Sequence, residues 1–294
     1  MFIRHSVNDE TNHTVYIGTP AWGNYEPMCR LVGLETKTYR HYDPATGLVD
    51  FESVMSAVRT ASRGSIFILQ ACCHNPTSAD LSIDQWHDLI DEISKRGLIP
   101  FFDIAYQGMG KGLDEDVYGV RYAVEKGLEL FVCQSFSKNF GLYGERVGAL
   151  HVLCGSKRNV RPVHDQLRCL IRWEFSSSPA YGSRLVNQVL SDEDNEASWV
   201  AELAIIRARL HSIREKFSHM LNNVYQVPGD WSVVTQGSGL FSLLPLTPDQ
   251  CRILQKECHI YMVPNGRITI SGLTDTNMDY VAKCIDSIVR RSVN

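Results

Sequence analysis

The chain has 294 residues, enough to bury a large core in one large or two medium domains. Hydrophobic residues make up 44% of it and charged residues 21%, which is ordinary for a globular protein. The formal net charge of −4 offers no basic surface for nucleic acid, and no apolar run approaches the roughly 20 residues that span a bilayer. The N-terminus lacks the apolar core of a secretory signal, so we expect a cytoplasmic protein without nucleic-acid or membrane partners.

Cysteine usage argues against a disulfide framework or a metal centre. The chain has nine cysteines, an odd number, at irregular spacing and without a CxxC pair. Most of them lie in apolar runs, where cysteine behaves as a small hydrophobic residue. We therefore expect free thiols and no zinc site.

The first part of the chain is predicted to alternate strands and helices, with strands at 14–18 and 36–42 and helices at 24–32 and 50–61. Trp22 follows the first strand in a turn. Its indole could be a core or lid aromatic, or it could be a stacking platform for a flat ring.

Three apolar runs, 65–72, 98–102 and 128–133, are typical of strands buried in a parallel sheet. Helices predicted at 83–96 and 114–126 separate them, and this rhythm indicates an α/β fold with a mainly parallel sheet. Each strand ends in polar residues: Asn75 after the first, Asp103 and Tyr106 after the second, and the segment 135–138 after the third. Open α/β sheets bind ligands at this end of their strands, so the sequence predicts a site there.

The third of these segments contains Lys138, flanked by Ser135 and Ser137 and followed by Arg146. A lysine at the end of a buried strand can be a nucleophile with a lowered amine pKa, although a lone loop lysine is more often solvated. Two hydroxyls and a guanidinium nearby are what a phosphate group requires. Together they suggest a Schiff-base lysine that holds a phosphorylated aldehyde cofactor.

The second half is predicted to be mostly helical before an α+β end. The predicted helices are 160–170, 182–190, 196–225 and 275–293, a strand is expected at 240–246, and residues 259–263 and 267–271 are expected to form a hairpin through Pro264-Asn265-Gly266. The predicted division is a large domain at 1–200, a linking helix at 201–225 and a small domain at 226–294. Arg172 could be a surface ion-pair residue, and Arg267 could face a ligand or lie on an edge strand.

Four motifs, HNPTS, FFDIAYQG, SFSKNFGLYGERVG and NGRITISGL, stand in the same order and at the same spacing as in the class I pyridoxal-phosphate-dependent aminotransferases. The chain resembles the aspartate aminotransferases of this family over nearly its full length. The resemblance implies fold type I, with a seven-stranded-type sheet covered by helices on both faces and a smaller C-terminal α+β domain.

The resemblance also implies a role for each strand-end residue. Lys138 would bind pyridoxal 5'-phosphate as a Schiff base and later move the proton at the substrate α-carbon. Asp103 would pair with the pyridine nitrogen of the cofactor. Tyr106 and Asn75 would hydrogen-bond the phenolic oxygen of the ring. Trp22 would stack on the ring, and both Trp22 and Asn75 would contact the substrate.

The remaining implied roles concern anionic groups. Ser135, Ser137 and Arg146 would bind the cofactor phosphate, and Arg267 would bind the substrate α-carboxylate. Arg172 would act in the neighbouring subunit's site on the side-chain carboxylate. This set implies dicarboxylic amino acids and 2-oxo acids as substrates, and a homodimer. The function so implied is amino-group transfer between L-aspartate and 2-oxoglutarate, giving oxaloacetate and L-glutamate.

The chain departs from the family pattern in two ways. It is expected to lack about 100 N-terminal residues, including the Ser-Gly-Thr phosphate loop, with its first five residues continuing the helix after that loop. Tyr25 and Gln70 stand where histidines commonly support the equivalent of Asp103, and Ser177 stands where asparagine is common. The alternative is therefore an inactive or weakly active truncated relative that acts as a partner subunit or represents an incomplete gene model. A mitochondrial location also stays open.

Overall fold

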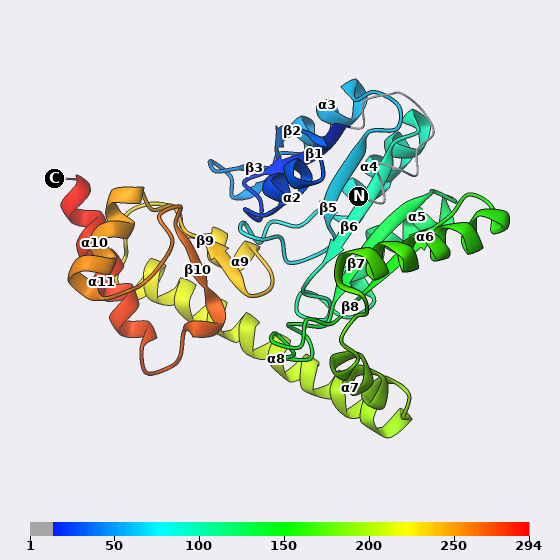
Figure 1. The fold of residues 1–294 in the computed structure, drawn as a ribbon. Helices are drawn as coiled ribbons and strands as arrows, with labels where there is room; N and C mark the ends of the chain where they lie inside the picture. The colour runs from blue at the N-terminus through cyan, green and yellow to red at the C-terminus, as the bar shows by residue number, and fades with distance from the viewer. Residues whose placement is uncertain (1–13, 294) are drawn as a thin grey trace.

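The computed structural model describes residues 14–293 and centres on a six-stranded sheet in the order β2-β1-β5-β6-β7-β8 (Figure 1). The strands are β1 (Thr14–Thr19), β2 (Glu35–Arg40), β5 (Ile66–Gln70), β6 (Ile99–Ile104), β7 (Leu130–Ser135) and β8 (Gly148–Leu153). All neighbours pair in parallel except β7 and β8, which are antiparallel. The mainly parallel sheet is confirmed. Six strands of it, rather than seven, lie within the described residues.

Both faces of the sheet are buried at β1 and β5, where successive side chains point to opposite faces. Tyr16 packs in a cluster with Phe67 and Phe102, and the adjacent Val15 and Ile17 pack in a second cluster on the opposite face. The first face is covered by α3 (Phe51–Thr60), α4 (Ile83–Arg96) and α5 (Tyr118–Glu125), and the second by α2 (Tyr25–Leu31). This arrangement confirms the prediction of helices on both faces.

Local signals determine the ends of α4. Ser82 and Gln85 form a capping box at its start, and Gly97 ends it in the left-handed conformation with φ of 63°. The predicted helix 114–126 is instead a 3₁₀ turn, η1 (Glu115–Val117), followed by α5. A short two-stranded sheet of β3 (Tyr42–Asp43) and β4 (Leu48–Val49) lies between β2 and α3 in the sequence.

Three helices follow the sheet: α6 (Lys157–Phe175), α7 (Tyr181–Leu190) and α8 (Glu193–His219), the last continuing as a π-helical turn, η2 (Met220–Val224). Figure 1 shows α8 running from α7 to the C-terminal part of the chain. The prediction that the first of these helices ends at residue 170 is wrong, because α6 continues to Phe175 and Ser176, with φ of 69°, ends it. Arg172 therefore lies in the last turn of a helix.

The C-terminal part contains α9 (Val233–Gln236), β9 (Phe241–Leu243), α10 (Pro248–Cys258), β10 (Arg267–Thr269), η3 (Ile270–Gly272) and α11 (Met278–Val293). The predicted hairpin between 259–263 and 267–271 is wrong: β10 pairs antiparallel with β9, and 259–263 forms no strand. The turn itself exists, since Gly266 N–H donates to the Val263 carbonyl at 3.1 Å. Ile260 and Met262 pack against the core, which uses their side chains without strand pairing.

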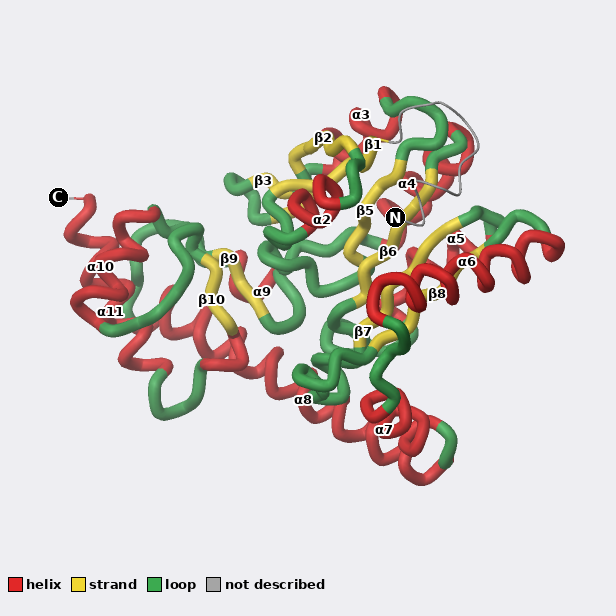
Figure 2. The backbone as a smooth tube through the Cα atoms, in the orientation of Figure 1, coloured by secondary structure: helices red, strands yellow, loops and turns green. Residues whose placement is uncertain are grey.

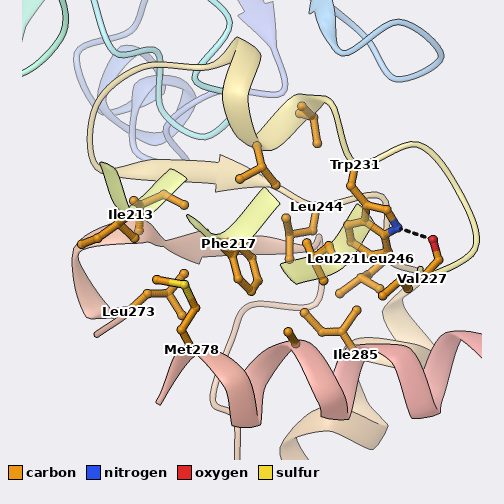
Figure 3. Packing of buried hydrophobic residues seen from close by; sticks show 14 of the residues in the cluster. Ile213, Phe217, Leu221, Val227, Trp231, Leu244, Leu246, Leu273, Met278 and Ile285 are labelled. Atoms are coloured by element: carbon orange, nitrogen blue, oxygen red, sulfur yellow. Dashed lines mark hydrogen bonds between the residues drawn. The ribbon is translucent and has the colours of Figure 1, made fainter. Parts of the chain in front are cut away.

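The end of α8 supplies part of the C-terminal core. Phe217 and Leu221 pack with Trp231, Leu244 and Ile285, and the Trp231 indole N–H donates to the Val227 carbonyl at 3.2 Å (Figure 3). The same cluster extends to Cys72, Cys73 and Tyr106 at the strand ends, so the C-terminal part packs directly against the loops of the sheet. We propose the three-part division at residues 200 and 225, with α8 as the linking helix.

The helix predicted for residues 1–5 lies outside the described residues. Within residues 14–293, no helix is both long and apolar enough to cross a bilayer.

Candidate active site

The polar residues predicted at the strand ends do meet at one edge of the sheet. Gln70 of β5 is level with Asp103 of β6, and Asp103 is level with Cys133 of β7. The loops that follow these strands face the C-terminal part of the chain (Figure 2). Because the three strands are parallel, their carboxyl ends bring residues far apart in sequence into one site.

Asp103 is the acidic centre of this edge. Its Oδ2 accepts a 2.5 Å hydrogen bond from the Tyr25 hydroxyl, and Oδ1 accepts none within the described part of the chain. Burial raises the pKa of Asp103, and the Tyr25 hydrogen bond and the nearby Lys138 charge oppose that rise. Gln70, the other residue that stands in place of a supporting histidine, contacts the backbone of Asn75 instead of Asp103. Its Oε1 accepts from the Asn75 N–H at 2.8 Å, and its Nε2 donates to the Asn75 carbonyl at 3.1 Å.

Lys138 lies above aromatic rings rather than in an ion pair. Its Nζ is 5.2 Å from the ring centroid of Tyr106 and 6.0 Å from that of Tyr143. Burial lowers the pKa of the amine, Asp103 raises it and Arg146 lowers it. A lowered amine pKa makes Lys138 a better nucleophile near neutral pH.

The residues predicted to bind a phosphate are brought together after β7. The Ser137 N–H donates to Ser135 Oγ at 3.1 Å, and Arg146 Nη1 donates to Ser137 Oγ at 3.4 Å. Arg146 has φ of 52° and also donates to the Tyr143 carbonyl at 2.9 Å, which fixes its guanidinium over the loop. Two hydroxyls and one guanidinium thus converge on one side of the site and can hold an anion.

Asn75 and Arg267 meet across the site. Arg267 Nη1 donates to Asn75 Oδ1 at 3.0 Å, and its guanidinium lies 4.7 Å from the ring centroid of Phe241. The Phe241 ring also meets Tyr106 edge-on, with centroids 5.9 Å apart. The contact settles the orientation of Arg267, which faces the strand ends rather than solvent at an edge strand.

Trp22 lies beside this group, half-exposed at 38% of its surface. Its ring meets Tyr25 at 85°, with centroids 5.4 Å apart. Its exposed surface is therefore available to stack on a planar ligand, while the contact with Tyr25 supports the indole from within the chain.

Arg172 is the one predicted site residue that the chain does not bring to this edge. It lies on α6, is exposed, and donates to Ser176 Oγ of the same helix end. No residue of α6 is buried, and Ile171, Trp173 and Phe175 are exposed hydrophobic residues on it.

Three aromatic residues of the site were not predicted from sequence. Phe241 supports Arg267 and Tyr106, Tyr143 lies near Lys138, and Trp199 of α8 stacks on Phe140 and donates to the Asn139 carbonyl at 3.0 Å. Tyr143 stands within the lysine motif and could have been found there. Phe241 and Trp199 come from distant elements and carry no local signal.

Comparison with known proteins agrees with this geometry. Residues 7–285 match the model of the family "Aminotransferase class I and II". The chain is 53% identical to aminotransferase tasG of Hapsidospora irregularis over 99% of its own length and 76% of that protein. It is 41% identical to aspartate aminotransferase 1 of Medicago sativa, covering 94% of this chain and 66% of that one.

A solved structure shows the same fold with the cofactor in place. The aromatic-amino-acid aminotransferase from Burkholderia pseudomallei, covalently bound to pyridoxal phosphate, superposes with a TM-score of 0.94 at 37% identity, over 98% of this chain and 71% of that one. The predicted cofactor and fold type are thereby confirmed. The chain belongs to the class I and II aminotransferase family.

Proposed function

We propose that the chain transfers an amino group between L-aspartate and 2-oxoglutarate, giving oxaloacetate and L-glutamate. The observation that carries the proposal is the convergence of Lys138, Asp103 and the Asn75–Arg267 pair on one sheet edge. Relatives named aspartate aminotransferases, at 36–41% identity over most of the chain, support this reaction.

The donor set fits pyridoxal phosphate on three counts. Asp103 has one carboxylate oxygen without a partner within the described residues, which suits a protonated ring nitrogen. Ser135, Ser137 and Arg146 form an anion-binding group, and the Lys138 amine has no ion-pair partner in the described part of the chain. When bound, the cofactor supplies an electron sink for the carbanion formed at the substrate α-carbon.

The protein's own residues would divide the remaining work. Lys138 Nζ would hold the cofactor covalently before substrate enters, and afterwards would carry the proton that leaves the α-carbon. Tyr106, whose pKa burial raises to about 12, stays a neutral hydrogen-bond donor at physiological pH. Asn75 would fix Arg267 through their 3.0 Å hydrogen bond, so that the guanidinium presents its other donors to the substrate α-carboxylate.

Arg172 would complete dicarboxylate binding in a homodimer. It lies on a helix with no buried residue in the single chain, and exposed Ile171, Trp173 and Phe175 flank it. An apolar helix surface of this kind suits a subunit interface, which would bring Arg172 of one subunit to the site of the other. We also propose a cytoplasmic location, because relatives with that designation are among the proteins that the chain resembles.

The test uses the full chain supplied with pyridoxal phosphate. The visible absorption of the bound cofactor and aspartate-dependent oxaloacetate formation are measured for the wild type, for Lys138→Ala, and for Lys95→Ala as a matched surface lysine. We expect activity in the wild type and Lys95→Ala, and none in Lys138→Ala. Comparable rates with aromatic amino acids and with aspartate would contradict dicarboxylate specificity, and absence of transfer to any 2-oxo acid would contradict the proposal.

A further inference from the structure

Tyr25 is placed rigidly behind the acidic centre of the site. It is the first residue of α2, its backbone N–H donates to the Trp22 carbonyl at 3.2 Å, and its side chain is buried. The phenol reaches Asp103 Oδ2 at 2.5 Å, across 78 residues of sequence. One tyrosine therefore contacts both the stacking indole and the carboxylate.

The hydrogen bond constrains how Asp103 can act. A phenol O–H donates one hydrogen bond, and here it donates to Oδ2, so Oδ1 is the oxygen with no partner within the described residues and both of its acceptor sites can serve a ligand. A hydrogen bond that a carboxylate accepts also favours its ionised form. This matters because burial of Asp103 pulls its pKa in the opposite direction.

The surroundings of this hydrogen bond are mostly apolar. A hollow of about 370 Å³ beside it is lined by Trp22, Tyr25, Asp103 and Cys133 together with aliphatic side chains. The Tyr25 side chain is only 5% exposed, so water competes poorly for its hydroxyl, which strengthens the contact between phenol and carboxylate.

The titratable groups facing this pair come from three other places. They are Tyr106 in the turn after β6, Cys133 on β7 and Lys138 in the following loop. Burial raises the pKa of Cys133 to about 11 and that of Tyr106 to about 12, and burial with Asp103 raises the pKa of Tyr25. Near neutral pH Tyr25, Cys133 and Tyr106 stay protonated, and the Lys138 amine would be bonded to the cofactor when the cofactor is present.

We propose that Tyr25 is a positioning residue. Its hydroxyl keeps Asp103 ionised and occupies Oδ2, so that Oδ1 is presented to the cofactor's pyridine nitrogen. The phenol keeps its proton at working pH, so the hydrogen bond persists there. The inference rests on the proposed function only for the cofactor, and is independent of which amino acid is the substrate. It gives a physical reason for a tyrosine at this position: an imidazole would make the same contact, but its charge would change between pH 5 and 8.

The test is the dissociation constant of pyridoxal phosphate from the full apoprotein, followed by quenching of protein fluorescence from pH 6 to 9. Tyr25→Phe removes the hydroxyl and keeps the ring beside Trp22. Tyr39→Phe is the matched control, since Tyr39 is also buried and its hydroxyl makes no hydrogen bond within the described residues. Tyr25→His replaces the phenol with a titrating donor.

We expect Tyr25→Phe to bind pyridoxal phosphate about ten- to a hundredfold more weakly than the wild type, the loss typical of a hydrogen bond to a charged group. The ratio of its dissociation constant to that of the wild type should grow as pH falls, because Asp103 without this hydrogen bond takes up a proton more readily. For Tyr25→His the same ratio should change with pH where the imidazole titrates, and Tyr39→Phe should match the wild type.

Equal affinity of Tyr25→Phe and wild type would overturn the inference. If Tyr25→Phe does not fold, Tyr25→His decides alone, because a ratio that does not change with pH contradicts it. A wild-type chain that binds the cofactor but transfers no amino group overturns only the proposed function, whereas one that binds no cofactor overturns both.

Discussion

Arg267 and Asn75, 192 residues apart in sequence, are joined by a 3.0 Å hydrogen bond between the guanidinium Nη1 and the amide Oδ1. The bond ties β10 of the C-terminal part to the loop after β5. The Phe241 ring, 4.7 Å from the guanidinium, fixes the same arginine from another side. Arg267 is therefore positioned before any substrate arrives, which reduces the ordering cost of binding a carboxylate.

Replacing Arg267 with lysine should weaken substrate use. A lysine cannot bind a carboxylate bidentately while also donating to Asn75, so we expect kcat/KM for aspartate to fall about ten- to a hundredfold. Arg252→Lys on α10 is the matched control, because Arg252 is exposed and pairs only with the neighbouring Asp249 and Pro248 within the described residues. Steady-state kinetics of the two variants would contradict the assigned role if they gave the same kcat/KM.

Ser238 should contribute to the contact between the C-terminal part and the Asn75 loop. Its Oγ donates to Asp80 Oδ2 at 2.6 Å, and its N–H donates to the Ser78 carbonyl at 3.2 Å. Asp80 is half-buried, and burial raises the pKa of its carboxyl, so removing one donor leaves its charge less satisfied. We expect Ser238→Ala to lower the free energy of unfolding by roughly 1.5–3 kcal/mol in urea titrations.

The control for that variant is Ser191→Ala, an exposed serine at the end of α7. It should unfold at the wild-type urea concentration. An unchanged midpoint for Ser238→Ala would show that the hydrogen bond to Asp80 adds nothing to stability.

His41 and His74 should make the protein sensitive to acid. Their rings stack with centroids 4.0 Å apart, and burial lowers the pKa of His41 to about 4 and that of His74 well below its usual value. The unfolded chain binds a proton at each near pH 6.5, whereas the folded chain does not. The free energy of unfolding is therefore not reduced by these histidines above pH 6.5. As pH falls from 6.5 toward 4, it decreases by up to about 1.4 kcal/mol per pH unit for each histidine.

The measurement is the free energy of unfolding at several pH values for the wild type and His41→Gln. The variant should show a shallower decline below pH 6.5, since it takes up one proton fewer on unfolding. His164→Gln on α6 is the control, because this histidine is exposed and its loss should leave the slope unchanged. Identical slopes for all three proteins would show that His41 is not the cause.

The proposed homodimer with shared sites can be tested by mixing two variants that are each expected to be inactive toward aspartate. Arg172→Leu lacks the arginine proposed to bind the side-chain carboxylate, and Lys138→Ala lacks the lysine proposed to hold the cofactor. If Arg172 acts across the interface, one site of a mixed dimer has both residues intact, and activity toward aspartate should return to about a quarter of the wild-type level after equal mixing. A chain that carries both substitutions should show no restored activity. If the mixture of the two single variants also restores none, Arg172 acts in its own subunit's site or in no site.

The sequence predicted best those features that neighbouring residues determine. Ser82, Gln85 and Gly97 define α4 to the residue, because caps are local interactions. The site edge was also predictable, since parallel strands necessarily carry Asn75, Asp103 and Ser135 to the same side.

The errors have tertiary causes. Residues 259–263 are predicted to be one strand of a hairpin because of the turn signal Pro264-Asn265-Gly266, but β9 takes the pairing position beside β10, and Ile260 and Met262 pack against the core instead. Phe241 and the Arg267–Asn75 hydrogen bond depend on how the C-terminal part packs on the sheet. No local pattern encodes contacts between segments so far apart in the chain.

The most direct test of the account is to locate the covalent bond to the cofactor. The full chain is incubated with pyridoxal phosphate, reduced with borohydride, digested and analysed by peptide mass spectrometry. We expect one reduced phosphopyridoxyl group, on the Lys138 peptide, and none on that peptide in Lys138→Ala. Labelling spread over surface lysines, with Lys138 unmodified, would contradict the claim that this loop anchors the cofactor.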